Sequence, residues 1–310
     1  MILCCGEALI DMIPAPTLSG RNGYVPHSGG AVFNTAIALG RLGAPAGMLT
    51  AISSDLFGQQ LLADLAASQV DRSMVIPTDR PTTLAFVRLE NGQARYAFFD
   101  ENSAGRMLTP ADMPILPPAV TALFLGGISL AVEPGASAYA DLALTQGTGR
   151  VVMLDPNIRP GFIKDADAYR ARLAHLMARA DIFKVSDEDL AWLIPGAAAL
   201  ADRVKTLRDA GDAVVIVTRG SAGAEAWLRD GTHIAVPGRA VTVVDTVGAG
   251  DTFNAGVLAH LAKGGHLTRA GIAALSPDHL RDALAFGAAV AAITVSRAGA
   301  NPPWHHEVTA

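Results

Sequence analysis

Short apolar runs alternate along this chain with longer amphipathic or alanine-rich stretches, and this alternation limits the possible folds more than any other feature. Runs rich in Val, Ile and Leu are typical of buried strands. They lie at Ile2–Cys5, Thr121–Leu125, Val151–Leu154, Ile182–Val185 and Ala213–Thr218. Because strands that alternate with helices form right-handed crossovers, the sequence predicts a mainly parallel sheet with helices on both faces.

Polar residues follow several of these runs. Ligands of open α/β sheets bind beyond the carboxyl ends of the strands. The residues at or soon after such an end are Asp11, Asn157, Arg159, Ser186 and Arg219. We therefore expect a single cleft to collect them.

A glycine-rich run, DTVGAGDTF at 245–253, has two glycines before a carboxylate at the expected start of a helix. Without side chains at Gly248 and Gly250 the backbone can turn tightly, and the N–H groups of Ala249, Gly250 and Asp251 can point at an anion near the positive end of the helix dipole. Asp251 beside this anion hole can take a proton from a hydroxyl nucleophile. The alternative is that Asp251 is only a helix N-cap.

Two familiar nucleotide-binding motifs are absent. No Gly-x-x-x-x-Gly-Lys-Ser/Thr occurs, and Phe253 stands where a dinucleotide fingerprint needs its third glycine. The site is therefore neither a P-loop nor a Rossmann motif, which disfavours a dehydrogenase.

A second motif, GGAVFNTAIALGRLG at 29–43, lies far upstream of the glycine-rich run. Together the two motifs resemble the signatures of the ribokinase-like sugar kinases, the phosphofructokinase-B family. The resemblance extends from GEALID at 6–11 to RAGA at 297–300. It implies one kinase domain over residues 1–310, with the ribokinase-like three-layer α/β/α fold and a small β-sheet lid.

A hairpin is predicted at 84–99, where two apolar stretches flank an Asn-Gly turn at 91–92. The resemblance implies that this segment belongs to a lid built from about 12–28 and 80–102, which closes over the sugar and often pairs two subunits. A surface hairpin packed on its own domain is the alternative.

The resemblance also assigns roles at both glycine motifs. It implies that Asp251 is the catalytic base and that Gly248, Ala249 and Gly250 shape the anion hole. The sugar-binding positions that it implies are Asp11, Gly29, Gly30 and Asn34. From the residues alone, Asp11 can also be an exposed turn carboxylate, and Asn34 an early-helix polar residue.

The segment Asp155-Pro-Asn-Ile-Arg159 resembles the fructokinase and ketodeoxygluconate kinase branch of the family. This implies that Asn157 and Arg159 bind substrate, with Arg159 on the sugar or on the transferring phosphate. The alternative for Arg159 is a structural ion pair with Asp155 or another carboxylate.

The ATP-binding residues implied by the resemblance lie in three segments. They are Ser186, then Thr218, Arg219, Gly220 and Gly223 of one loop, and Ala288 of a C-terminal helix at about 278–296. The loop can also be an ordinary strand-to-strand turn. Many relatives have asparagine where this chain has Ala288, so that polar contact to adenine is lost.

The segment Ser186-Asp187-Glu188-Asp189 replaces the Asn-x-x-Glu of most relatives, a pair that acts through water on magnesium. Asp189, or Glu188 in its place, is therefore expected to act indirectly on Mg²⁺ that arrives with ATP. Ser-x-x-Asp is also close to a helix capping box. The family often uses a monovalent cation such as K⁺, and Asp245 is the position expected to influence it.

Charge and cysteine content exclude several classes of protein. The net charge of −5 is spread without long like-charged runs, so we expect neither nucleic acid nor membrane as a partner. The only cysteines, Cys4 and Cys5, are adjacent in an apolar stretch and lack zinc-site spacing. With no secretion signal or long apolar run, we expect a cytoplasmic protein that binds small molecules.

The function that these observations favour is ATP-dependent phosphorylation of a sugar hydroxyl, with fructose converted to fructose 6-phosphate. The alternatives are 2-keto-3-deoxygluconate kinase and ribokinase. A catalytically silent sugar-binding regulatory protein is the alternative of another class, and the intact Asp251 beside the glycine hole argues against it.

Overall fold

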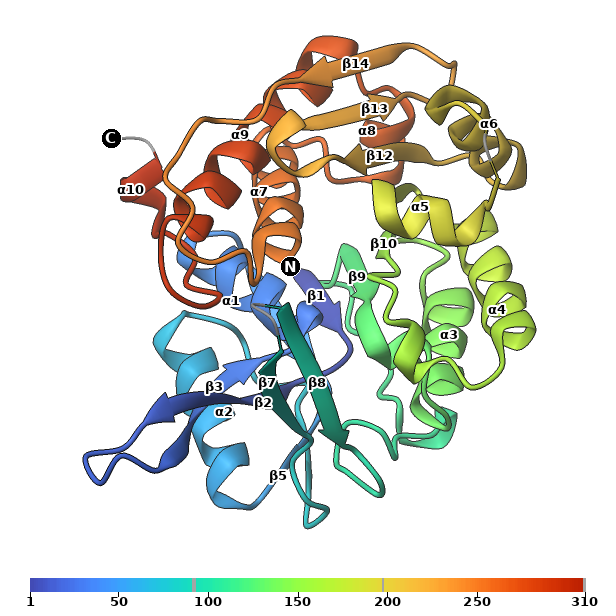
Figure 1. The fold of residues 1–310 in the computed structure, drawn as a ribbon. Helices are drawn as coiled ribbons and strands as arrows, with labels where there is room; N and C mark the ends of the chain where they lie inside the picture. Colours follow the sequence, from blue (N-terminus) through green and yellow to red (C-terminus); the bar gives the residue numbers. More distant parts are fainter. Residues whose placement is uncertain (91–92, 197, 309–310) are drawn as a thin grey trace.

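The computed structural model describes residues 1–90, 93–196 and 198–308, and its main element is an eight-stranded sheet (Figure 1). The strand order is β14 (His233–Val236), β13 (Ala224–Trp227), β12 (Val214–Thr218), β11 (Ile182–Ser186), β10 (Val151–Asp155), β9 (Ala122–Gly126), β1 (Ile2–Cys5) and β4 (Ala46–Leu49). Neighbours from β12 to β4 are parallel, so the predicted strands and the mainly parallel sheet are confirmed. The antiparallel edge of β13 and β14 was not predicted.

Helices cover both faces of this sheet, because successive side chains of each strand point to opposite faces. Ile2 and Cys4 pack with one helical layer, and Leu3 and Cys5 pack with the other. The first layer contains α1 (Ala31–Arg41), α2 (Leu56–Ala67), α7 (Ala249–Lys263), α8 (Arg269–Ala273) and α9 (Pro277–Val295). The second contains α3 (Gly135–Gln146), α4 (Ala166–Arg179), α5 (Asp187–Leu193) and α6 (Leu200–Ala210).

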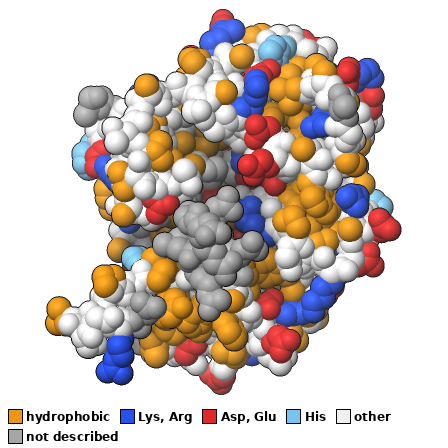
Figure 2. All heavy atoms as spheres, in the orientation of Figure 1, with side chains coloured by type: hydrophobic (Ala, Val, Ile, Leu, Met, Phe, Trp, Pro, Cys, Tyr) orange, Lys and Arg blue, Asp and Glu red, His pale blue; other side chains and the backbone are white. Residues whose placement is uncertain are grey.

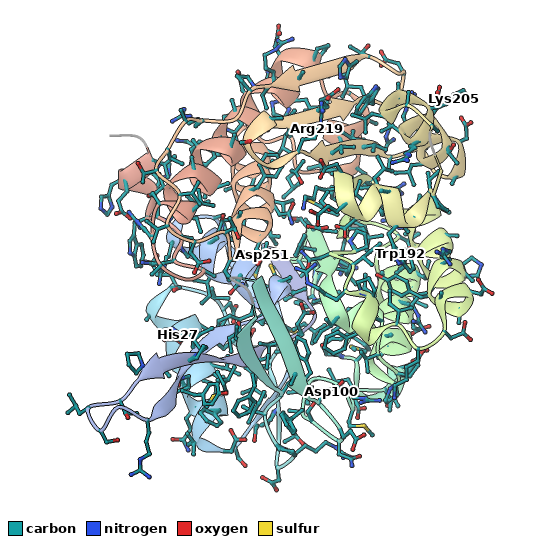
Figure 3. The ribbon with its side chains drawn as sticks, in the orientation of Figure 1. His27, Asp100, Trp192, Lys205, Arg219 and Asp251 are labelled. Atoms are coloured by element: carbon teal, nitrogen blue, oxygen red, sulfur yellow. The ribbon has the colours of Figure 1, made fainter. Side chains whose placement is uncertain are left out.

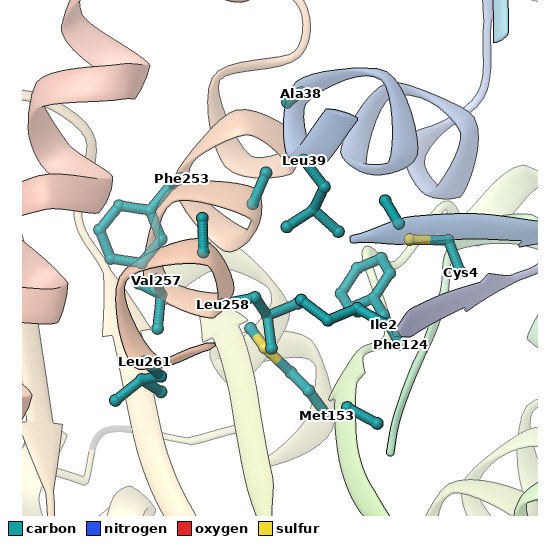
Figure 4. Packing of buried hydrophobic residues seen from close by; sticks show 14 of the residues in the cluster. Ile2, Cys4, Ala38, Leu39, Phe124, Met153, Phe253, Val257, Leu258 and Leu261 are labelled. Carbon is teal, nitrogen blue, oxygen red and sulfur yellow. The ribbon is translucent and has the colours of Figure 1, made fainter. Parts of the chain in front are cut away.

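The first layer is centred on α7, which lies between α1 and α9. Figure 4 shows Leu258 of α7 beside the sheet residues Phe124 and Met153. The predicted C-terminal helix is α9, and the short helix α10 (His305–Val308) packs beside it. Among the described residues, no helix is both long enough and apolar enough to cross a membrane.

A separate four-stranded sheet has the order β3 (Asn22–Gly29), β2 (Leu9–Pro16), β7 (Leu84–Glu90) and β8 (Gln93–Phe99). β7 and β8 are antiparallel and form the predicted hairpin, whose Asn-Gly turn at 91–92 lies outside the described residues. Because β2 begins soon after β1 ends, this small sheet lies beyond the carboxyl end of β1. A two-stranded sheet pairs β5 (Ala51–Ser53) with β6 (Ile76–Thr78).

Candidate active site

Helix α7 begins at the glycine-rich run. Gly248 precedes the helix with a φ of 78°, a left-handed conformation that favours glycine. The N–H of Thr252 makes the first hydrogen bond of the helix, so the N–H groups of Gly250 and Asp251 come before the helical ladder. The N–H of Ala249 donates instead to the preceding turn, at 3.3 Å. Together with the helix dipole, the first turn has the chemistry of an anion site.

Asp251 is the third residue of α7 and lies near the centre of the molecule (Figure 3). Its Oδ2 accepts a hydrogen bond of 2.9 Å from Nδ2 of Asn34. Since Gly248 occupies the N-cap position, the alternative that Asp251 is the N-cap is wrong. Burial raises the pKa of Asp251 to about 7, while Asn34 and the charge of Lys184 oppose the rise. A carboxyl group that titrates near neutral pH suits general base catalysis.

A cavity of about 310 Å³ lies between the first turn of α7 and the small sheet. We call it the small-sheet cavity. Its lining includes Glu7, Asp11, Gly30, Asn34, Phe98, Asn157, Arg159, Gly248, Ala249, Gly250 and Asp251. The structure thus brings together residues of both glycine motifs and of the Asp155–Arg159 segment, which are far apart in the sequence.

The glycine pair at 29–30 allows close approach of backbone and side chains. A Cβ at Gly29 would lie 2.2 Å from Oδ2 of Asp11, and Gly30 has a φ of 106°. Asp11 lies inside β2, so it neither follows a strand of the main sheet nor belongs to an exposed turn. Burial raises its pKa to about 6. The small sheet therefore brings a carboxylate into the cavity.

Glu7 is a cavity residue to which the sequence analysis gave no role. Its Oε1 accepts from the N–H of Ala31 at 3.0 Å, and its Oε2 from the N–H of Ser129 at 3.3 Å. Burial raises its pKa. Glu7 thus ties the start of α1, which carries Asn34, to the segment that follows β9.

A second cavity, of about 650 Å³, lies on the other side of the first turn of α7. We call it the β11 cavity. Its lining includes Lys184, Ser186, Asp187, Glu188, Asp189, Trp192, Thr218, Arg219, Gly220 and Ser221. Figure 2 shows acidic side chains gathered at a hollow near the centre of the face drawn. The two cavities share Asn157, Arg159, Thr246, Ala249 and Gly250, so ligands in the two cavities can meet at this turn.

Two arginines line the β11 cavity and differ in their partners. Arg159 is exposed and donates to the carbonyl of Ile158, and no ion pair joins it to a carboxylate in the described part of the chain. Asp155 is bound to Lys184, so the alternative of an Arg159–Asp155 ion pair is wrong. Arg219 pairs with Glu225 at 2.5 Å. Arg159 is therefore the guanidinium available to a ligand at the shared wall.

Ser186 and Asp189 form the predicted capping box at the start of α5. Ser186 Oγ accepts from the N–H of Asp189 at 2.9 Å, and Asp189 Oδ2 accepts from the N–H of Ser186 at 3.4 Å. Asp189 Oδ1 also accepts from the N–H of Ile158 at 3.0 Å. Burial raises the pKa of Asp189. Its carboxylate thus fixes the loop that carries Arg159, while Glu188 beside it is exposed.

Four predicted site residues do not line either cavity in the described structure; one is Gly29, which lies against Asp11 as described above. Gly223 has a φ of 96°, and a Cβ there would lie 2.2 Å from the carbonyl oxygen of Val236. Ala288 packs against the hydrophobic core. Asp245 accepts from the N–H groups of Val247 and Gly299, at 3.0 and 2.9 Å. The loop of Thr218 and Gly220, by contrast, lines the β11 cavity and also connects β12 to antiparallel β13.

A larger cavity of about 810 Å³ lies near the amino ends of β1, β4 and β9. Its lining includes Met1, Leu42, Pro45, His260 and Phe286. Its lining contains no carboxylate, unlike the linings of the small-sheet and β11 cavities. The described residues also contain no cluster of His, Cys, Asp and Glu that can hold a metal ion by itself.

Comparison with known proteins identifies close relatives. The family model for pfkB family carbohydrate kinases matches residues 1–307. A fructokinase from Rhizobium leguminosarum bv. trifolii is 50% identical over 283 residues, which cover 91% of this chain and 86% of that protein.

Solved structures agree with this match. A fructokinase with bound ATP from Xylella fastidiosa has a TM-score of 0.89 at 29% identity, covering 99% of this chain and 96% of that chain. A fructokinase double mutant from Vibrio cholerae O395, with fructose, ADP and potassium ion bound, has a TM-score of 0.82 at 26% identity. The match covers 96% of this chain and 93% of that chain. The predicted ribokinase-like fold is confirmed. The chain belongs to the pfkB family of carbohydrate kinases.

Proposed function

We propose that this protein is a cytoplasmic kinase that transfers the γ-phosphate of ATP to fructose and forms fructose 6-phosphate. The observation that carries this proposal is the wall shared by the two cavities, where Ala249 and Gly250 of the first turn of α7 line both and Asp251 beside them lines the small-sheet cavity. The similarity to fructokinases supports fructose as the sugar. Similarity to a structure with bound ATP supports the nucleotide.

In the proposed reaction the sugar occupies the small-sheet cavity and ATP occupies the β11 cavity. Asp251 takes the proton of the attacking hydroxyl, whose oxygen forms a bond to the γ-phosphorus while the bond to the β-phosphate oxygen breaks. The N–H groups of Gly250 and Asp251, with the guanidinium of Arg159, stabilise charge on the transferring group. Asp11 and Asn34 orient the sugar hydroxyls, which needs rigid donors and acceptors.

Magnesium fits the β11 cavity through the carboxylates that line it. Asp187, Glu188 and Asp189 offer the oxygen ligands that Mg²⁺ prefers, and we propose that Asp189, or Glu188 in its place, acts on the ion through water. When bound with ATP, Mg²⁺ neutralises phosphate charge. We also propose a K⁺ requirement, since the loop fixed by Asp245 precedes the anion hole.

The specificity constant for fructose should fall as the pH drops below about 7, because a base must be ionised to take a proton and burial raises the pKa of Asp251 to about 7. A second fall is expected below about 6, where Asp11 becomes protonated. Initial rates from pH 5 to 9 would show both steps. In Asp11→Asn the step near 7 should remain; a profile that is flat from pH 5 to 8 would contradict the role of Asp251.

Asp189→Asn should raise the free Mg²⁺ needed for half-maximal rate and lower turnover, because the amide carries no charge for the ion. Glu188→Gln tests the alternative carboxylate, since it removes the charge of the exposed neighbour and should shift the magnesium titration only if Glu188 acts in place of Asp189. Magnesium titrations at fixed ATP compare the variants with wild type. If Asp189 acts only as a cap, its titration will superimpose on wild type and the loss will be roughly 1 kcal/mol of stability.

A homodimer through the small sheet is also proposed. Tyr24 and Phe99 are exposed and each packs edge-to-face on Phe86, so this sheet presents aromatic surface. Exposed apolar surface of this kind is typical of interfaces. Sedimentation at high concentration should show a dimer, and a monomer throughout would refute it.

The test of the proposed substrate is an ATP-consumption screen over fructose, ketodeoxygluconate, ribose, glucose, tagatose and aminoimidazole riboside. Fructose should give the highest specificity constant. A clear preference for ketodeoxygluconate or ribose would assign the sugar to one of the alternatives. Sugar binding without turnover on any of them would support the silent regulatory protein.

A further inference from the structure

Three buried polar side chains lie directly behind the first turn of α7. Oδ2 of Asp155 accepts from Nζ of Lys184 at 2.8 Å and from Nδ2 of Asn254 at 2.7 Å. The residues are 1%, 2% and 0% exposed, respectively. A lysine is rarely buried this deeply, and burying a charge pair costs free energy that such hydrogen bonds only partly offset. Since this buried charge pair lies beside the wall shared by the two cavities, we look for a role beyond stability.

The three side chains come from different elements and reach different parts of the site. Asn254 lies on α7 one turn after Asp251. Nζ of Lys184, on β11, lies 3.2 Å from the position of a Cβ on Gly250. The other oxygen of Asp155 accepts from the N–H of Asn157 at 3.2 Å, where the loop to Arg159 begins. One carboxylate therefore connects the catalytic helix, β11 and the Arg159 loop.

We infer that Asp155, Lys184 and Asn254 form a positioning unit for phosphoryl transfer, in which Asp155 holds α7 at Asn254, one turn after Asp251, and Lys184 sets the charge beside Asp251. The inference rests on the proposed kinase function and adds residues that act through Asp251 and the anion hole. Asn254 Oδ1 is buried without a hydrogen-bond partner among the described residues, so Asn254 is held only through its amide nitrogen.

The unit contains one negative and one positive charge, so removing either charge changes the field at Asp251 in a known direction. Loss of Lys184 leaves Asp155 uncompensated and favours protonated Asp251, and loss of Asp155 does the reverse. The other groups that face Asp251 are Asn34 on α1 and Arg159 in its loop. Glu7 and Asp11 line the same cavity from the N-terminal side.

The test compares Lys184→Met, Asp155→Asn and the double variant with wild type, using the pH profile of kcat/KM for the sugar. The acidic step followed here is the one near pH 7 that belongs to Asp251. We expect it to move to higher pH in Lys184→Met and to lower pH in Asp155→Asn. In the double variant it should lie between them. Asn254→Leu, which keeps the volume but removes the hydrogen bond, should lower kcat while KM for ATP and sugar changes less than about threefold.

Asp181→Asn is the matched control for stability. Asp181 is also buried in a charge network, with Arg179 at 3.0 Å and Arg229 at 3.1 Å, but it lines neither catalytic cavity. It should lower the melting temperature without moving the acidic step. If Lys184→Met fails to fold, Asp155→Asn and Asn254→Leu still decide, because both are close in shape to the residues they replace.

The inference is overturned if the acidic step stays at the wild-type pH in Lys184→Met and Asp155→Asn, or moves in the same direction in both. It is also overturned if Asn254→Leu loses no more kcat than Asp181→Asn. Wild-type activity in the same assay separates this failure from failure of the proposed function. If the wild-type protein phosphorylates a sugar other than fructose, the variants are compared with that sugar. If it phosphorylates no sugar, both the proposed kinase function and the positioning unit are refuted.

Discussion

Asp251→Asn should lose at least about 10²-fold in turnover while it still folds and binds ATP and sugar. The amide cannot accept the hydroxyl proton, but it has nearly the shape of the carboxylate and retains an oxygen for Nδ2 of Asn34. Single-turnover rates and ligand titrations on the same preparation would separate chemistry from binding. Turnover close to wild type would show that Asp251 is not the base.

The same substitution should stabilise the protein at alkaline pH. Since burial raises the pKa of Asp251 from 3.8 to about 7, the folded state binds the proton more tightly than the unfolded state. Asp251 therefore makes its full contribution to the free energy of unfolding below about pH 4, and this contribution is lost as the pH rises through about 7. The loss is at most about 4 kcal/mol. Melting curves should show the variant above wild type at pH 8, with the difference shrinking toward pH 5. A variant less stable than wild type at pH 8 would contradict the burial argument.

Arg159→Met should lose roughly 10²-fold in kcat/KM, the loss expected when one group that stabilises transition-state charge is removed. Arg159 lines both cavities and has no carboxylate partner in the described structure, so its guanidinium is available to the transferring phosphate. Arg159→Lys should recover only part of the activity, because lysine keeps the charge but not the planar fork. Steady-state kinetics with varied ATP and fructose would measure these losses.

Arg219→Met is the matched control, because Arg219 also lines the β11 cavity but is paired with Glu225. Its loss should be much smaller than that of Arg159→Met and should lie mainly in KM for ATP. Equal losses in the two variants would mean that charge near the nucleotide matters and that the position of Arg159 does not.

Local patterns in the sequence were sufficient to predict the main strands and the 84–99 hairpin. Apolar runs with β-branched residues are typical of buried strands, and each predicted run forms one. The glycine motifs predicted a tight turn and a close approach of the backbone to its neighbours. Gly248 forms the turn, and Gly29 lies too close to Asp11 for a side chain. Strands and turns of this kind depend on residues that are close in the chain, so they can be predicted from the sequence.

Contacts between distant segments could not be predicted in the same way. Asp155 binds Lys184 and Asn254, which lie 29 and 99 residues away, and only the fold brings them together. A lysine inside the apolar run Ile182–Val185 was the one available signal for this unit. The alternative of an Arg159–Asp155 pair was wrong for the same reason, since proximity in sequence suggested a partner that the fold gives to Lys184.

The central claim is transfer of phosphate from ATP to fructose, and identification of the product tests it most directly. Incubation with ATP, Mg²⁺ and fructose, followed by ³¹P NMR, should show fructose 6-phosphate formed in equal amount with ADP. Phosphate on another hydroxyl would contradict the proposed orientation of the sugar. Release of inorganic phosphate, or no ADP at all, would contradict the kinase itself.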